Sequence, residues 1–281
     1  MLPIGQMKFL NNRLTLIGNS RAGEATGFYI PELDLMLDAG FIVTSTKFRR
    51  LFVTHGHNDH SFEIPRMYSA SSSNPLDIYV PRLSLSYFER YLSSAQILND
   101  HDEEHAAKIC KLRYTLHGVS EEETIDLDEN LRVEIIRCHH KIPCVGYAFY
   151  EKRNKLKAEY TQLQGKQIQE LKKQGIAVTE QVLTPLFAFL GDTTPEVFNS
   201  SSHSGRVLLG QMPVIICECS FLDGEQSDDK GHTHWAGLKP IVEQHPQTKF
   251  ILIHFSLKHK RNEIIAFFEN QSLKNVLPFV E

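Results

Sequence analysis

The feature that most restricts the fold is the six-residue run His55–His60, in which four side chains are of types that bind transition metals. Neutral imidazole and carboxylate groups are good zinc ligands. The run directly follows Arg50–Thr54, an apolar stretch that we expect to be a strand. Alternation along an extended turn points the first two histidines the same way, toward one ion. The aspartate and histidine that end the run, at the turn into a helix, can then point at a second ion.

Three further predicted strands also end at a residue of a metal-binding type. Val133–Cys138 is followed by His139 and His140, Leu186–Leu190 by Gly191-Asp192-Thr193, and Phe250–Ile253 by His254. A single histidine at a strand end is more often structural than a ligand. Together with the His55–His60 run, however, these residues support one another, because sites in layered folds are built from strand ends and the loops that follow them.

The order of predicted elements is mostly strands, then a helix, then strands again, with helices and strands alternating late in the chain. The apolar β-branched runs predict ten strands, at 13–17, 27–30, 34–37, 50–54, 77–80, 132–138, 146–150, 186–190, 214–217 and 250–253. Helical patterns cover 165–174, 236–244, 261–270 and 83–98, the last with an apolar stripe that includes Leu83, Phe88 and Leu92. This pattern predicts an α+β fold of four αββα layers, with two sheets packed face to face and helices outside.

Composition is that of an ordinary globular protein, since 41% of the 281 residues are hydrophobic and 23% are charged. No apolar run approaches the length of a membrane span, and the first residues do not have the pattern of a secretory signal. The five cysteines are an odd number without a CxxC pair, which favours a reducing compartment. We therefore expect one domain over residues 1–281, in the cytoplasm and not associated with a membrane.

Charge is distributed unevenly along the chain. The formal net charge is −4. Residues 151–173 nevertheless hold seven basic side chains against three acidic ones, so the rest of the chain is more acidic than the whole. This segment interrupts the succession of strands and ligands. Charged runs usually form solvated surface, which here would be a helical hairpin. The alternative is a basic arm that contacts RNA phosphates through charge, independently of the RNA sequence.

Seven short motifs together resemble one known family. They are Leu37-Asp38-Ala39-Gly40, His55–His60, His140, Gly191-Asp192-Thr193, Glu218-Cys219-Ser220-Phe221, Gly231-His232 and His254-Phe255-Ser256. The chain resembles the metallo-β-lactamase superfamily and, within it, the tRNase Z family, with plant short forms as the nearest type. The resemblance extends from about Leu14 to Glu281. The glutamate motif, the later histidine motif and His-Phe-Ser are the parts most specific to tRNase Z.

The resemblance implies a metallo-β-lactamase sandwich that holds two zinc ions, with manganese as an alternative metal. His55, His57 and His140 would hold the first ion, Asp59, His60 and His254 the second, and Asp192 would bridge them. Asp38 would lie behind the site and orient a ligand histidine. Of the two adjacent histidines, His140 is preferred to His139 because its distance to Gly146-Tyr147 matches the family.

The implied activity is removal of the 3′ trailer from precursor tRNA by a hydroxide generated between two metals. The residues assigned to catalysis are Asp59, His232 and Glu218. His232 would be the general acid, held in place by Glu218, although His234 could instead take that position from the sequence alone. The alternative function is that of another hydrolase of this superfamily, with a small phosphodiester or thioester substrate.

The resemblance also places an inserted arm for tRNA at residues 151–183 and implies a homodimer in which one subunit's arm serves the other's site. The basic residues assigned to RNA contact are Lys152, Arg153, Lys155, Lys157, Lys172 and Lys173. One departure from the family is that Phe62 and Glu63 replace a pair of glycines after the His55–His60 run. We expect these two side chains to narrow or recharge the pocket.

Overall fold

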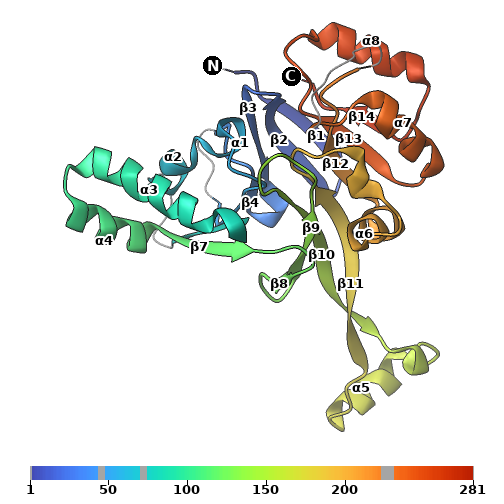
Figure 1. Ribbon diagram of the computed structural model, residues 1–281. Helices are drawn as coiled ribbons and strands as arrows, with labels where there is room; N and C mark the ends of the chain where they lie inside the picture. Colours follow the sequence, from blue (N-terminus) through green and yellow to red (C-terminus); the bar gives the residue numbers. More distant parts are fainter. Residues whose placement is uncertain (1, 44–47, 70–74, 223–230, 281) are drawn as a thin grey trace.

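The computed structural model describes residues 2–43, 48–69, 75–222 and 231–280, and these residues form two mixed sheets (Figure 1). The seven strands of the first sheet, in spatial order, are β1 (Gly5–Phe9), β2 (Leu14–Arg21), β3 (Ala25–Ile30), β4 (Leu35–Leu37), β5 (Arg50–Phe52), β6 (Leu76–Pro81) and β7 (Tyr114–Val119). Strands β1 to β4 are antiparallel neighbours, whereas β4 to β7 are parallel.

The second sheet repeats this organisation in the other half of the chain. Its strands, in spatial order, are β14 (Val276–Pro278), β13 (Lys249–Ile253), β12 (Val214–Glu218), β11 (Thr179–Phe189), β10 (Val145–Leu156), β9 (Leu131–Arg137) and β8 (Thr124–Asp126). Strands β11 to β14 are parallel, and β10 is antiparallel to both β9 and β11. Strands β9, β11, β12 and β13 therefore all end at the same edge of the sheet.

Helices cover the outer face of each sheet, so the predicted four-layer αββα fold is confirmed. The first half supplies α1 (Asn58–Ser61), α2 (Ile64–Ser69), α3 (Leu85–Asp100) and α4 (Glu103–Arg113), and the second half supplies α6 (His203–Gln211), α7 (Trp235–Gln244) and α8 (Arg261–Gln271), whereas α5 (Gly165–Lys173) lies away from the sheets at the far end of β10 and β11. An aromatic core that includes Phe28, Phe52, Phe187 and Phe189 lies between the sheets. Two more apolar clusters join each sheet to its own helices. No helix in the described part of the chain has the length and apolar character to cross a lipid bilayer.

Several elements were not predicted, and their physical reasons differ. Helix α4 buries only Ala106 and Cys110 among its described side chains, so it carries no apolar stripe, and the Asp102 side chain caps its start. Leu83 was predicted to lie on the buried stripe of the 83–98 helix, but 79% of this side chain is exposed. That prediction is wrong because the residue lies in a separate turn, Arg82–Ser84, before α3 begins.

Strands β10 and β11 extend well beyond their predicted limits. After a register shift between Phe149 and Tyr150, their pairing continues to Leu156 and Thr179, through a stretch whose side chains are mostly polar. Backbone hydrogen bonds hold this ribbon together, so no hydrophobic alternation marks it in the sequence. Figure 1 shows the ribbon projecting from the body of the protein and ending at α5.

Candidate metal centre

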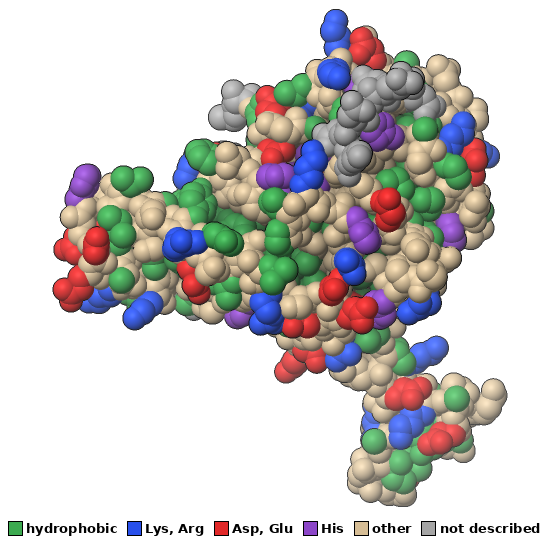
Figure 2. Space-filling model, in the orientation of Figure 1, with side chains coloured by type: hydrophobic (Ala, Val, Ile, Leu, Met, Phe, Trp, Pro, Cys, Tyr) green, Lys and Arg blue, Asp and Glu red, His purple; other side chains and the backbone are tan. Residues whose placement is uncertain are grey.

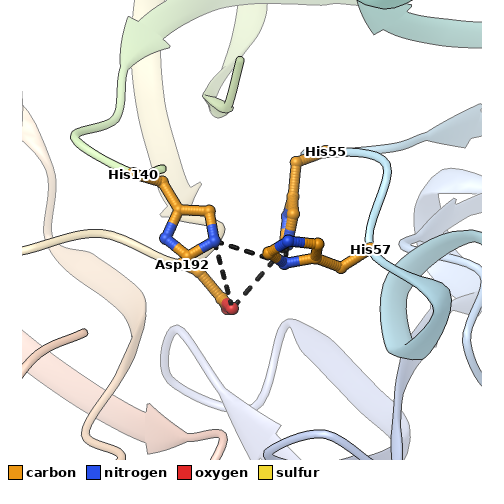
Figure 3. A group of neighbouring side chains, drawn as sticks. All are labelled: His55, His57, His140 and Asp192. Atoms are coloured by element: carbon orange, nitrogen blue, oxygen red, sulfur yellow. Dashed lines mark hydrogen bonds and ion pairs between the residues drawn. The ribbon is translucent and has the colours of Figure 1, made fainter. Parts of the chain in front are cut away.

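Three histidines that are far apart in the sequence direct ring nitrogens at one another (Figure 3). His55 and His57 follow β5, and His140 follows β9. His57 Nδ1 lies 3.0 Å from His55 Nε2 and 3.3 Å from His140 Nε2. Asp192, after β11, completes the group with its Oδ2 atom 3.7 Å from His55 Nε2 and 4.0 Å from His140 Nε2.

A second group lies on the other side of the Asp192 carboxylate. His60 Nε2 and His254 Nε2 are 3.2 Å apart, and Asp59 Oδ2 is 3.6 Å from the first and 3.4 Å from the second. Asp192 Oδ1 is 3.3 Å from His60 Nε2 and 3.5 Å from His254 Nε2. The two oxygens of one carboxylate therefore face two separate groups, which is the arrangement that a bridging ligand requires.

These distances fit the donor set of zinc. Tetrahedral zinc with bonds of about 2.0–2.1 Å to nitrogen and oxygen separates its ligand atoms by roughly 3.3 Å. Within the first group, the histidine nitrogens are 3.0–3.3 Å apart. His140 Nδ1 lies 2.9 Å from the carbonyl oxygen of Gly231, which only accepts, so the proton belongs on Nδ1 and Nε2 keeps its lone pair.

Asp38 lies behind the second group and orients His60. Its Oδ2 atom is 2.8 Å from His60 Nδ1, and its Oδ1 atom accepts a hydrogen bond from the Thr54 backbone N–H at 2.7 Å. The Asp38 side chain is completely buried. Asp38 thus fixes the His60 ring and turns Nε2 toward Asp59 and Asp192.

Replacing Asp38 with asparagine is expected to weaken metal binding by about ten- to a hundredfold. An amide cannot carry the negative charge that supports the His60 ring, and one of its terminal atoms becomes a donor. Competition with a chelator, read by metal content per chain, measures the affinity. The Asp34→Asn variant is the control, because Asp34 forms an exposed ion pair with Arg49. Unchanged metal affinity in the Asp38 variant would contradict the orienting role.

The electrostatics of the site favour a bound cation. Burial, with the nearby His60, lowers the pKa of His55 well below its ordinary value, so this imidazole is neutral, as a ligand must be. Burial opposes the charge on His60, but the carboxylates of Asp192 and Asp38 outweigh it and raise the pKa of His60 to about 10. Burial also opposes the charge on Asp192, but the surrounding histidines, His254 foremost, hold the pKa of this carboxyl below its usual range. The buried carboxylates therefore stabilise positive charge at this site. A bound metal cation would be stabilised in the same way as a protonated histidine.

The backbone is unusual at two of these positions. Asp38 and His254 have φ angles of 56° and 62°, in the left-handed region that side chains other than glycine seldom adopt. Such conformations cluster at functional sites, where the surrounding structure enforces them. Gly40 is needed for a different reason, since a Cβ atom there would lie 1.8 Å from the Asp59 carbonyl oxygen. The loop after β4 therefore packs directly on the turn that carries Asp59.

His232 and Glu218 form a pair beside the first metal group. His232 Nδ1 is 3.2 Å from both Glu218 oxygens and 3.6 Å from Asp192 Oδ2. The Glu218 carboxylate is buried and accepts the Thr193 N–H at 2.7 Å. His234 instead stacks on the Phe221 ring at 4.7 Å and precedes α7. Of the two histidines that the sequence left open, only His232 meets the glutamate.

A cavity of about 270 Å³ lies over the two groups and is lined by residues that include His57, Asp59, Asp192, His232 and His254. Ser220 also lines this cavity and was given no role in the sequence analysis. Its hydroxyl donates to Glu218 Oε2 at 2.6 Å and lies 3.1 Å from His254 Nδ1. Ser220 thus links the second metal group to the glutamate. Its place within the Glu-Cys-Ser-Phe motif was the only signal in the sequence.

The two residues that replace family glycines do not line this cavity. Phe62 is 62% exposed, and the Glu63 carboxylate pairs with Arg66 at 2.8 Å. These two side chains therefore neither narrow the cavity over the metal groups nor add charge to its lining, contrary to the expectation from the sequence. His139, which the sequence analysis did not choose as a ligand, is in neither metal group. Its backbone N–H donates to Thr193 Oγ1.

Two packed mixed sheets, with histidines and aspartates gathered at their common edge, define a metal-dependent hydrolase of the metallo-β-lactamase fold. The metallo-β-lactamase fold protein YhfI from Bacillus subtilis superposes with a TM-score of 0.60 at 12% identity, over 94% of each chain. Human short-form tRNase Z superposes with a TM-score of 0.51 at 16% identity, over 98% of this chain and 93% of that one. At these identities the likeness establishes the fold.

Sequence similarity identifies the family within this class. A chloroplastic tRNase Z of Arabidopsis thaliana is 30% identical over 276 residues, which cover 94% of this chain and 74% of that protein. The chain belongs to the tRNase Z family. No protein-family model matches it.

Proposed function

We propose that this protein is a zinc-dependent endoribonuclease that removes the 3′ trailer from precursor tRNA, with two zinc ions as its cofactors. The observation that carries the proposal is the His232–Glu218 pair beside two ligand groups that share Asp192. Membership of the tRNase Z family supports the same substrate. The seven ligands we assign are His55, His57, His140, Asp192, Asp59, His60 and His254.

When bound, two zinc ions would lower the pKa of a water molecule and neutralise charge on the phosphate oxygens. The protein's own contribution is to hold the reacting groups in a fixed geometry. Asp59 is 13% exposed at its side chain and lines the cavity, so it contacts both the second ligand group and the space where the phosphate must lie. We therefore assign Asp59 a role in orienting the attacking water as well as in binding metal.

His232 is the general acid in this proposal. Its Nδ1 atom is held by Glu218, so Nε2 is the nitrogen that gives a proton to the 3′ oxygen as that oxygen leaves. The product tRNA then ends in a 3′-hydroxyl, and the trailer begins with a 5′-phosphate. Buried Glu218 accepts from Nδ1 and restricts the rotation of the imidazole ring.

Metal analysis combined with a cleavage assay tests the proposed function. We expect two zinc ions per chain and cleavage of a trailer-bearing precursor tRNA immediately after the discriminator base. Protein that leaves the precursor intact, while it rapidly hydrolyses bis(p-nitrophenyl) phosphate, would instead indicate a hydrolase with a small phosphodiester substrate. Hydrolysis of neither phosphodiester but of a thioester would point to the other alternative.

The segment 151–183 is proposed to be the arm that grips tRNA. In support, Figure 1 shows it projecting away from the body, as a partner-reaching element of a homodimer would. Lys155, Lys172 and Lys173 are exposed and Lys157 is partly exposed. Lys152 differs, because its side chain is 7% exposed and its ammonium lies 2.7 Å from Asp126 Oδ1.

The exposed lysines therefore carry the RNA-binding proposal, and Lys152 serves to attach the arm to β8. The Arg153 guanidinium also has a local partner, the Glu151 carboxylate. We propose a homodimer in which each arm holds the tRNA that the other subunit cuts. The mass of the protein in solution, measured by sedimentation equilibrium, tests the number of subunits. The cytoplasmic location stays a prediction, supported by five free cysteines and tested by cell fractionation.

Removing the charge of Lys172 and Lys173 together is expected to weaken tRNA binding and to reduce its dependence on salt. Each phosphate contact that is lost means that fewer counterions are released on binding. The magnitude of the negative slope of log K against log salt should therefore fall by about 0.7–0.9 per contact. The matched control removes Lys108 and Lys111 from α4, which are also exposed lysines. Equal losses for the arm pair and the α4 pair would argue against a dedicated arm.

A further inference from the structure

A groove flanks the metal centre along helix α3. It consists of two cavities of about 520 Å³ and 360 Å³ that share the lining residues Leu83, Ile142 and Pro143. The larger cavity is lined in part by His140, and the smaller one by Gly56, which lies between His55 and His57 in the sequence. Figure 2 shows hydrophobic side chains gathered in the hollow between the α3 region and the body of the protein. The groove is therefore continuous with the residues that build the metal site.

One face of α3 forms the wall of the smaller cavity. Tyr87 and Phe88 lie four and three residues before Tyr91, so these three side chains share one side of the helix, and Ser84 precedes them in the turn Arg82–Ser84. Phe88 is buried, and the Tyr91 hydroxyl donates to the Phe62 carbonyl oxygen at 2.8 Å. This hydrogen bond connects α3 to the turn that carries the metal ligands. The position of the groove is thereby fixed relative to the metal centre.

Tyr87 presents a largely exposed aromatic ring at the groove. It is 64% exposed, and Leu83 beside the groove is 79% exposed. The Arg90 guanidinium lies 4.9 Å from the centre of the Tyr87 ring, which restrains the ring in its exposed position. Exposed apolar groups gathered at one rim mark a binding surface.

The polar groups in the groove identify the kind of ligand. Asn58 and Ser61 line the same cavity as Tyr87, and they lie one and four residues after His57 in the sequence. A nucleobase offers a flat face for stacking and polar edges for hydrogen bonds, and proteins that bind unpaired RNA satisfy both needs with aromatic and amide or hydroxyl side chains. A purely apolar ligand such as an acyl chain would form no hydrogen bond with the Asn58 amide, so a base fits the groove better.

We propose that this groove binds an unpaired base of the RNA strand adjacent to the scissile phosphate, with Tyr87 as the stacking platform and Asn58 at the base edge. This inference rests on the proposed function, because the groove begins at Gly56 and His140, beside the ligands where the strand would be cut. Stacking on a tyrosine tolerates any base, which suits a trailer of variable sequence.

Replacing Tyr87 with alanine is expected to raise the KM for precursor tRNA by about tenfold, because one stacking contact is lost. The Tyr87→Phe variant keeps the ring and should restore the wild-type KM. Leu98→Ala is the matched control, since Leu98 is 74% exposed on the same helix and is not among the groove residues. Hydrolysis of bis(p-nitrophenyl) phosphate, which has no base, reports on the metal centre of each variant.

Precursors with a single abasic nucleotide near the cleavage point locate the contact. One of them should raise the KM of the wild-type protein about tenfold and have no further effect on the Tyr87→Ala variant. A wild-type KM in Tyr87→Ala, or abasic effects that add fully to that of the substitution, would overturn the groove proposal.

Direct binding separates this proposal from the proposed function. A fluorescently labelled single-stranded RNA oligonucleotide should bind the wild-type protein about tenfold more tightly than the Tyr87→Ala variant, whether or not cleavage occurs. Equal binding would reject the base site even if the protein processes precursor tRNA. Weaker binding in the variant, with no processing by the wild-type protein, would reject the tRNA substrate and keep the RNA groove.

Discussion

Replacement of Asp192 with alanine is expected to lower kcat/KM for both precursor tRNA and small phosphodiesters by about a thousandfold, equivalent to roughly 4 kcal/mol of transition-state stabilisation. The physical reason is that Asp192 presents Oδ2 to the first ligand group and Oδ1 to the second. Without this carboxylate, the two ligand groups would lose the negative charge that they share, and each would hold a cation less tightly. Metal content should fall together with activity.

The Asp77→Asn variant is the control for this experiment. Asp77 also pairs with a histidine, His117 at 2.8 Å, but at a half-exposed position on β6. It should keep its metal and its activity. A variant without the Asp192 carboxylate that retained two ions per chain and normal turnover would exclude a bridging role and, with it, the ligand set proposed here.

Replacement of His232 with alanine is expected to lower kcat for precursor tRNA by about a hundred- to ten-thousandfold, the contribution of a positioned general acid. The leaving 3′ oxygen of RNA is a poor leaving group that needs a proton. The p-nitrophenolate that leaves bis(p-nitrophenyl) phosphate is a stable anion, so hydrolysis of that ester should fall far less. The ratio of the two effects measures proton donation.

The Glu218→Gln variant tests the same pair from the other side. Its amide keeps the size of the side chain but lacks the charge that His232 Nδ1 meets at 3.2 Å. We expect a smaller loss in the same direction, again larger for RNA than for the nitrophenyl ester. Parallel losses on both substrates would show that His232 and Glu218 support the metal site and do not supply a proton.

The metal cluster could be predicted because its residues follow buried strands. Strands β9, β11 and β13 are apolar runs that point the same way in one sheet, so the residues after them meet at one edge, and β5 of the other sheet is followed by the His55–His60 run. The contacts of Asp38 and Ser220 could not be derived in this way, because they depend on side-chain directions within loops. Asp38 itself, and His254, which Ser220 contacts, have left-handed backbone, which no hydrophobic pattern predicts.

The surroundings of two other side chains were not evident from the sequence: the RNA contact of Lys152 stays a prediction, and the placement of Leu83 on the helix stripe is wrong. Lys152 was grouped with the basic arm because charge along a sequence carries no information about pairing. Its partner Asp126 is brought close only when β8, β9 and β10 align. Leu83 was assigned to the core because helical spacing places it on the stripe with Phe88, whereas the chain bends into a short turn before the helix.

The ligands are divided between the two halves of the chain. The half that ends with β7 provides Asp59 and its three histidine neighbours, while His140, Asp192 and His254 come from the later half. Neither half alone holds all the donors of either group, so the ligand cluster is assembled only where the two sheets pack against each other.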